Sequence, residues 1–151
     1  MKVLGIDPGL ANLGWAVIDG DVIVDCGVIK TQSKMQNDAR LLRLFEELEN
    51  IVDKHNLFGG VMANERLPYG ARMKSASSIG EVIGVLGLLC AFYQMKRFEY
   101  SPMSAKRQAT GSGKATKEMV IETARTLGWK GAIVEHSADA IAIARMHLTA
   151  G

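Results

Sequence analysis

The sequence contains little that would make the chain disordered, disulfide-bonded or membrane-embedded. Among 151 residues there are only 3 prolines and 2 cysteines. Hydrophobic residues make up 48% of the chain, and no low-complexity run interrupts it. This composition excludes a disordered chain and is typical of a folded one. The length predicts a single domain, residues 1–151, that buries a substantial core.

Cys26 and Cys90 stand far apart, without a CxxC spacing or a neighbouring histidine. We therefore expect reduced core thiols of a cytosolic protein rather than a zinc motif or a disulfide framework. The longest apolar stretch, 79–93, contains Glu81 and is too short to span a bilayer. Met1 leads directly into the first predicted strand, so we expect no signal peptide. Together these absences predict a soluble, cytoplasmic protein.

Charge is nearly balanced over the whole chain but is unevenly distributed along it. The net charge is +2, yet residues 1–65 carry 6 basic and 10 acidic side chains, whereas residues 66–130 carry 11 basic and 4 acidic ones. An acidic half joined to a basic half indicates a polyanion held against a carboxylate-rich centre. Ordinary solvated charge is the alternative interpretation of these counts.

The stretch that organises the prediction is KVLGIDPG, residues 2–9. Its apolar residues predict a short buried strand, which Pro8-Gly9 ends. Asp7 therefore stands at the tip of a buried strand, a rigid position that suits a metal ligand. Alternatively, Asp7 only caps the turn through its own backbone.

Hydrophobic periodicity and turn residues predict an alternation of strands and helices. Asp19-Gly20 is a strong hairpin signal between two strands. The predicted strands are 2–7, 13–18, 22–29, 58–65 and 97–103, and the predicted helices are 37–56, 75–96, 116–128 and 135–149. Gly80, Gly84 and Gly87 lie inside the second helix, where each glycine costs about 1 kcal/mol relative to alanine. They predict close packing of another backbone, either the sheet or a twofold-related copy of the helix.

The predicted strand 58–65 also ends in a carboxylate, Glu65. The segment that follows, 66–74, is basic and contains glycine and proline. We expect Arg66, Arg72 and Lys74 to contact phosphates and Tyr69 to stack on a base. Tyr69 as an ordinary surface aromatic is the alternative.

The segment 104–117 resembles a phosphate-binding loop only superficially. The loop requires glycine and serine or threonine where this chain has Gln108 and Ala115, so nucleotide binding is rejected. The segment is instead predicted to be a flexible basic loop that meets a DNA backbone. Its candidate contacts are Lys106, Arg107, Lys114 and Lys117.

His136 and Asp139 lie three residues apart at the start of the last predicted helix, so they share one face. If this helix packs near the tips of the first and fourth strands, both side chains converge with Asp7 and Glu65. Crowded carboxylates repel one another unless a cation neutralises them. Oxygen-rich ligands with one imidazole favour Mg²⁺ or Mn²⁺ over zinc. A helix-capping or otherwise satisfied His136 is the alternative.

These motifs occur in the order and spacing of the RuvC family of Holliday junction resolvases, which the chain resembles from about residue 3 to 148. The resemblance rests on Gly5-Ile6-Asp7-Pro8-Gly9, Gly14-Trp15, Glu65, the glycines at 80–87, Lys106, Gly111-x-Gly113-x-Ala115-x-Lys117 and His136-x-x-Asp139-Ala140. It implies an α/β protein with an RNase H-like fold, a mixed five-stranded sheet flanked by helices. It also implies a homodimer that binds four-way DNA junctions and nicks two strands symmetrically with Mg²⁺.

Residue by residue, Asp7, Glu65 and Asp139 match the acidic ligands of the family. His136 stands where many members have a further aspartate and others a histidine. Lys106 and Lys117 match basic DNA-contacting positions. The base-stacking aromatic of the family lies three residues after the glutamate, where this chain has Pro68, with Tyr69 one residue later.

From this resemblance we expect a crossover junction endonuclease that leaves 5′-phosphates. Two divalent ions, Mg²⁺ or alternatively Mn²⁺, would be bound by Asp7, Glu65, His136 and Asp139. The alternatives are a broader, phage-type nuclease for branched DNA such as forks and flaps, and a non-catalytic junction-binding module. The module is disfavoured because convergent acids would repel DNA. The sequence does not identify a helicase partner.

Overall fold

The computed structural model describes residues 1–67, 73–101, 117–126, 129, 131 and 135–150. Within these residues the elements are, in order, β1 (Lys2–Asp7), β2 (Asn12–Asp19), β3 (Val22–Lys30), α1 (Asn37–Lys54), β4 (Val61–Glu65), α2 (Met73–Phe92), β5 (Lys96–Tyr100), α4 (Lys117–Thr126) and α5 (Glu135–Ala150).

The strands form one five-stranded sheet in the order β3-β2-β1-β4-β5. The β1–β2 and β2–β3 pairs are antiparallel, whereas β1–β4 and β4–β5 are parallel. The expected mixed five-stranded sheet is therefore confirmed. Its central strand is β1, the apolar stretch at the start of the chain, whose backbone pairs with β2 on one side and β4 on the other.

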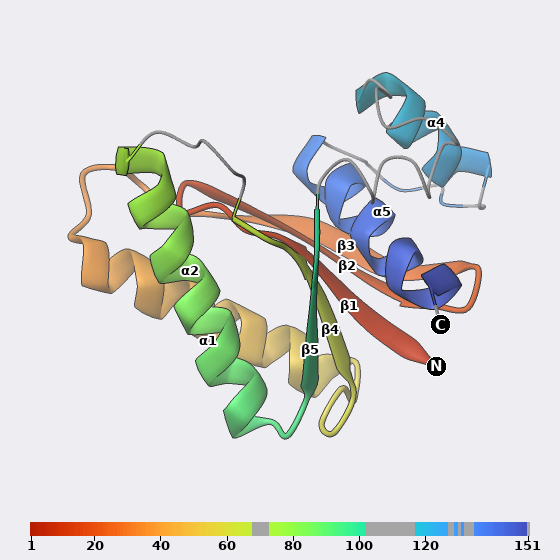
Figure 1. Ribbon diagram of the computed structural model, residues 1–151, viewed down its shortest axis with the longest axis horizontal. Coiled ribbons are helices and arrows are strands. Elements are labelled where there is room, and N and C mark those ends of the chain that lie inside the picture. Colours follow the sequence, from red (N-terminus) through yellow and green to blue (C-terminus); the bar gives the residue numbers. More distant parts are fainter. Residues whose placement is uncertain (68–72, 102–116, 127–128, 130, 132–134, 151) are drawn as a thin grey trace.

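Helices cover both faces of the sheet, as Figure 1 shows, with α1 and α2 on one side and α5 and α4 on the other. Side chains alternate between the faces along each strand. Leu4 and Ile6 of β1 join the core beneath α1 and α2, while Val3 joins the core beneath α5. Asp7 therefore follows Val3 and Gly5 on the face that α5 covers.

The helix α5 lies unusually close to the sheet because small residues line the contact. Ala138, Ala140, Ala142 and Ala144 are buried. A β-carbon on Gly14 would overlap the backbone of His136. A β-carbon on Gly5 would overlap the backbone of α5 in the same way. Because Gly5 and Gly14 have no side chain, α5 can approach β1 and β2 this closely.

Two predicted boundaries are wrong because the chain turns through left-handed backbone conformations. Asn56 has φ 55° and Gln94 has φ 54°. β4 consequently begins at Val61, later than the predicted strand 58–65. α2 ends at Phe92 rather than near residue 96, and Lys96 already belongs to β5. Both turns precede parallel strands, so they set where β4 and β5 enter the sheet.

The structure tests the first of the two explanations of the glycines in α2, packing against the sheet. Among the described residues, a β-carbon on Gly80 or Gly84 would meet no atom within 4 Å, and one on Gly87 would meet only the Arg97 side chain, at 3.7 Å. Packing against the sheet is therefore the wrong explanation for Gly80 and Gly84. Within the described residues, no side chain or backbone covers that surface of α2.

Both cysteines are free thiols, Cys90 buried and Cys26 half-buried. Burial raises the pKa of each to about 11, and the neighbouring Asp25 carboxylate adds to the effect at Cys26. At neutral pH both thiols remain protonated and are weak nucleophiles. Both cysteines are therefore free thiols that pack in the interior or at its margin, in agreement with the sequence prediction. No helix in the described part of the chain is long and apolar enough to cross a membrane.

Candidate active site

Two of the predicted acids, Asp7 and Glu65, stand at the carboxyl ends of two neighbouring strands. β1 and β4 are parallel, and their register pairs Gly5 with Ala63 and Ile6 with Asn64. The next residues along the two strands are Asp7 and Glu65. Adjacent strands lie about 4.8 Å apart, so both carboxylates start from neighbouring points on the edge of the sheet. Both are half-buried.

The first turn of α5 brings a histidine to the same place. His136 Nδ1 lies 3.1 Å from Asp7 Oδ2, although 129 positions separate the residues in sequence. The Asp7 side chain is 16% exposed and that of His136 is 37% exposed, so solvent reaches the pair mainly from the histidine side. The first turn of α5 therefore lies at the tip of β1, which meets for that strand the condition that the sequence analysis set.

Asp139 follows one helical turn after His136 and is half-buried. It shares the helix face of His136 and so belongs to the layer between α5 and the sheet. Within the described residues, however, no group of three or more histidine, cysteine or acidic side chains is close enough to hold a metal ion. The structure brings Asp7 and His136 into contact, and places Glu65 and Asp139 on the adjoining strand end and helix turn.

The donor set suits a hard divalent cation. Asp7, Glu65 and Asp139 offer carboxylate oxygens, and His136 offers a single imidazole. Mg²⁺ prefers oxygen ligands and retains several waters, so it does not need a complete cage of side chains. By their chemistry, these residues fit the predicted ion.

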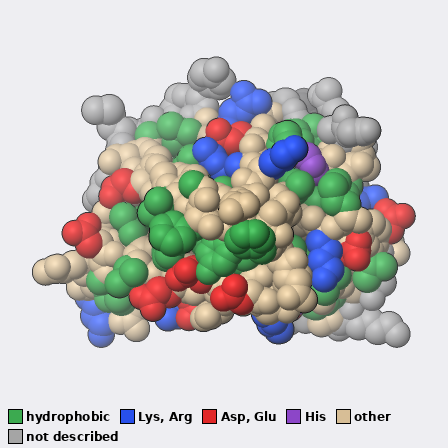
Figure 2. Space-filling view, turned by 90° about the horizontal axis from the view of Figure 1, so that it is seen from below, with side chains coloured by type: hydrophobic (Ala, Val, Ile, Leu, Met, Phe, Trp, Pro, Cys, Tyr) green, Lys and Arg blue, Asp and Glu red, His purple; other side chains and the backbone are tan. Residues whose placement is uncertain are grey.

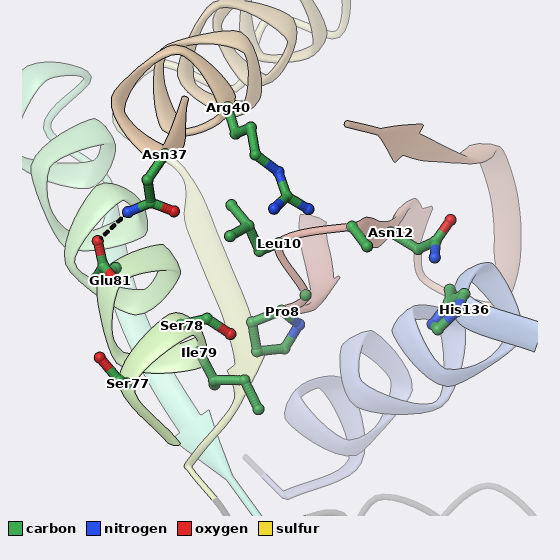
Figure 3. A pocket seen from close by; sticks show the side chains of 12 residues that line it. Pro8, Leu10, Asn12, Asn37, Arg40, Ser77, Ser78, Ile79, Glu81 and His136 are labelled. Atoms are coloured by element: carbon green, nitrogen blue, oxygen red, sulfur yellow. Dashed lines mark hydrogen bonds between the residues drawn. The ribbon is translucent and has the colours of Figure 1, made fainter. Parts of the chain in front are cut away.

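A cavity of about 770 Å³ opens beside the Asp7–His136 pair. Its walls come from the β1–β2 turn, the start of α1, the first half of α2 and His136, as Figure 3 shows. The lining residues are Pro8, Gly9, Leu10, Ala11, Asn12, Asn37, Arg40, Ser77, Ser78, Ile79, Glu81 and His136. A volume of this order is typical of a ligand-binding cleft.

The sequence prediction missed Arg40. Its signal was available, because Arg40 precedes Leu44 by one turn and Leu48 by two, on the buried face of α1. A charged residue on the apolar face of a helix calls for a specific partner. Arg40 has one, since its Nε donates a hydrogen bond to Thr31 Oγ1 at 2.9 Å.

Most of the predicted DNA contacts cannot be placed. Tyr69, Arg72, Lys106, Arg107 and Lys114 lie outside the described residues. Lys74 and Lys117 belong to α2 and α4, but their side chains are not described. Arg66 follows β4, is exposed and donates its backbone N–H to Tyr100 at the end of β5.

The strand order, the parallel central pair and the structural similarity below define an RNase H-like α/β protein. The family model described as crossover junction endodeoxyribonuclease RuvC matches residues 3–147. The chain belongs to the RuvC family.

Relatives agree with the family model over nearly the whole chain. The crossover junction endodeoxyribonuclease RuvC of Caldicellulosiruptor saccharolyticus is 34% identical and aligns with 98% of this chain and 92% of its own length. The protein of the same name from Chloroflexus aggregans is 37% identical, with 97% and 92% covered.

Two solved structures of Thermus thermophilus RuvC are similar to this fold at 27% sequence identity. The first has a TM-score of 0.84 and the second, a complex with a Holliday junction substrate, has a TM-score of 0.87. In both cases the similarity covers 98% of this chain and 93% of the other. The RNase H-like fold expected from the resemblance is thereby confirmed.

Proposed function

We propose that this protein is a structure-selective endodeoxyribonuclease that resolves four-way (Holliday) junctions by metal-dependent, symmetric nicking and leaves 5′-phosphates. The observation that carries the proposal is the contact between Asp7 and His136, beside Glu65, in a chain of the RuvC family. A cytoplasmic location remains a prediction from the sequence.

Asp7, Glu65, Asp139 and His136 would hold the metal, proposed as two Mg²⁺ or Mn²⁺ ions. When bound, such ions activate a water and stabilise charge on the leaving oxygen. The role of the protein itself is to hold these ligands in fixed positions. β1 fixes the backbone of Asp7 in the centre of the sheet, and His136 contacts one of its carboxylate oxygens. In the tautomer with a proton on Nδ1, His136 donates that hydrogen bond and restrains the carboxylate.

Contacts to the DNA backbone are proposed for the basic residues of the segments 66–74 and 104–117. Lysine and arginine side chains neutralise phosphates and release counterions, so they bind DNA without reading its sequence. The proposed contacts are Lys106, Arg107, Lys114, Lys117, Arg72 and Lys74, with Tyr69 as a stacking residue.

The test of this function is a comparison of four substrates, namely a four-way junction, a fork, a flap and a linear duplex, each with Mg²⁺, Mn²⁺ or a chelator. We expect paired nicks in opposite strands of the junction, ending in 5′-phosphates and abolished by the chelator. Equal cutting of forks and flaps would favour a broader nuclease for branched DNA. Junction binding without any cutting would favour the non-catalytic module.

A homodimer is proposed because symmetric nicking requires two sites. The exposed side of α2 offers the surface, since Leu88 is 55% and Phe92 67% exposed while Gly80 and Gly84 leave it open. Figure 2, which looks onto the molecule from below, shows hydrophobic side chains gathered in the middle of the face that it draws. An apolar patch of this kind, with small residues along the helix, is typical of an association surface.

Leu88→Asp is expected to convert the dimer to a monomer, because a carboxylate would be buried without a partner at the interface. Light scattering measures the mass in solution. Val24→Asp is the matched control, since Val24 is an exposed apolar residue on β3, away from α2. A wild-type protein that is monomeric in dilute solution, or a Leu88→Asp variant that remains dimeric, would contradict the use of this surface.

A further inference from the structure

The cavity beside the Asp7–His136 pair contains a cation that the proposed chemistry does not use. Arg40 reaches from α1 toward the β1–β2 turn, and Figure 3 shows its side chain extending to the neighbourhood of Leu10 and Asn12. His136 lines the same cavity and contacts Asp7. The space in front of Arg40 is therefore continuous with the place where a phosphate would be cut.

Arg40 is held in position by a short relay of hydrogen bonds. Its Nε donates to Thr31 Oγ1 at 2.9 Å, and the Thr31 hydroxyl donates to the carbonyl oxygen of Leu10. The Thr31 backbone N–H also donates to the carbonyl oxygen of Ala11, at 3.0 Å. One edge of the guanidinium is thus fixed to the turn that directly follows Asp7.

The other edge of the guanidinium has donors to spare. Among the described residues, neither terminal nitrogen of Arg40 donates a hydrogen bond, and no carboxylate lies within 4.0 Å of the guanidinium. The acid in the cavity wall, Glu81, accepts a hydrogen bond from the Asn37 side chain at the opposite side. A guanidinium with free N–H groups in a solvent-filled cleft is suited to bind an oxyanion in a bidentate manner.

We propose that this cavity binds a phosphodiester group of the cleaved DNA strand, next to the phosphate that is cut, and that Arg40 is its cation. The proposal rests on the proposed junction-cutting function, because DNA is the anion that this function brings to Asp7. Ser77 and Ser78 line the same cavity from α2. Arg40 is then a positioning residue, which sets how the strand lies across the acids.

The experiment scans the phosphates on both sides of the cleavage site with single methylphosphonates, which remove the charge of one phosphate at a time. Junction affinity is measured by titration without divalent ions, so that no strand is cut. For the wild type we expect one position adjacent to the cut phosphate to lose affinity about 10- to 100-fold, as expected for a charge-assisted hydrogen bond. Arg40→Gln is expected to lose a similar factor on unmodified DNA.

The decisive result is how the two changes combine. If Arg40 binds that phosphate, the methylphosphonate at the sensitive position costs Arg40→Gln little further affinity, whereas Arg43→Gln remains fully sensitive. Arg43 lies on the same helix, but it pairs with Glu47 and donates to the carbonyl oxygen of Lys30. Thr31→Val, which removes the relay but keeps the cation, should also retain the sensitivity.

The proposal would be overturned if, at every methylphosphonate position, the loss of affinity simply adds to the loss caused by Arg40→Gln. It would also be overturned if the wild type has no sensitive phosphate beside the cut. Circular dichroism reports whether Arg40→Gln is folded. If Arg40→Gln is unfolded, Arg40→Lys takes its place. The methylphosphonate at the sensitive position should then cost Arg40→Lys less affinity than it costs the wild type. An equal loss of affinity would count against Arg40. A wild type that neither binds nor cuts junctions would instead refute the proposed function, so the two failures are distinguishable.

Discussion

Asp7→Asn is expected to lower junction cleavage by at least about 100-fold, since even changes to residues that support metal ligands commonly cost about 10- to 100-fold. The amide has nearly the shape of the carboxylate but lacks its charge, so it binds Mg²⁺ poorly. Junction affinity should remain close to that of the wild type, because Asp7 repels the phosphate backbone rather than attracting it. Single-turnover cleavage and a binding titration measure the two effects separately.

Asp21→Asn is the matched control for this change. Asp21 is an exposed residue in the turn between β2 and β3, so its loss alters the net charge by the same amount away from the site. Its cleavage rate should equal that of the wild type. If Asp7→Asn nicks the junction at the wild-type rate, Asp7 is not a ligand needed for the reaction.

Gly14→Ala is expected to destabilise the fold by about 1–3 kcal/mol or more, the usual cost of overpacking a core. The added methyl group would overlap the backbone carbonyl of His136, an atom that cannot move without displacing α5. His136 and Asp139 would then shift from Asp7 and Glu65, so cleavage should fall even under conditions where the variant remains folded. Urea denaturation measures the loss of stability.

The control for the glycine is Gly87→Ala, within α2. A β-carbon there would make only an ordinary contact with the Arg97 side chain, and alanine favours a helix by up to about 1 kcal/mol. This variant should therefore be as stable as the wild type or more so. A Gly14→Ala variant with unchanged stability would mean that α5 does not rest against β2 as closely as the structure has it.

Much of the fold follows from local patterns in the sequence. The apolar run of β1, the hairpin after Asp19 and the periodic face of α1 each predicted an element that the structure contains. The boundaries near Asn56 and Gln94 were missed because both residues adopt positive φ. A glycine at these positions would have indicated such a turn, whereas asparagine and glutamine do so only weakly. Local signals thus gave the elements, and special turns decided where two of them begin or end.

The site was harder to predict because its parts meet only through packing. The three-residue spacing put His136 and Asp139 on one face of the last helix, and the structure brings His136 of that face into contact with Asp7. Nothing local could reveal that Gly14 makes room for the backbone of His136, or that Arg40 is tied to the β1–β2 turn through Thr31. Both facts depend on residues distant in the sequence, and both bear on how the acids are held.

The most direct test is a crystal structure of the protein with Mn²⁺, in which the ion is located by its anomalous scattering. Manganese bound by the Asp7 carboxylate together with Glu65 and Asp139 is the expected result, with His136 at the same centre. Manganese bound only elsewhere, with the side chains of β1, β4 and α5 left apart, would contradict a shared metal site and with it the proposed cleavage chemistry.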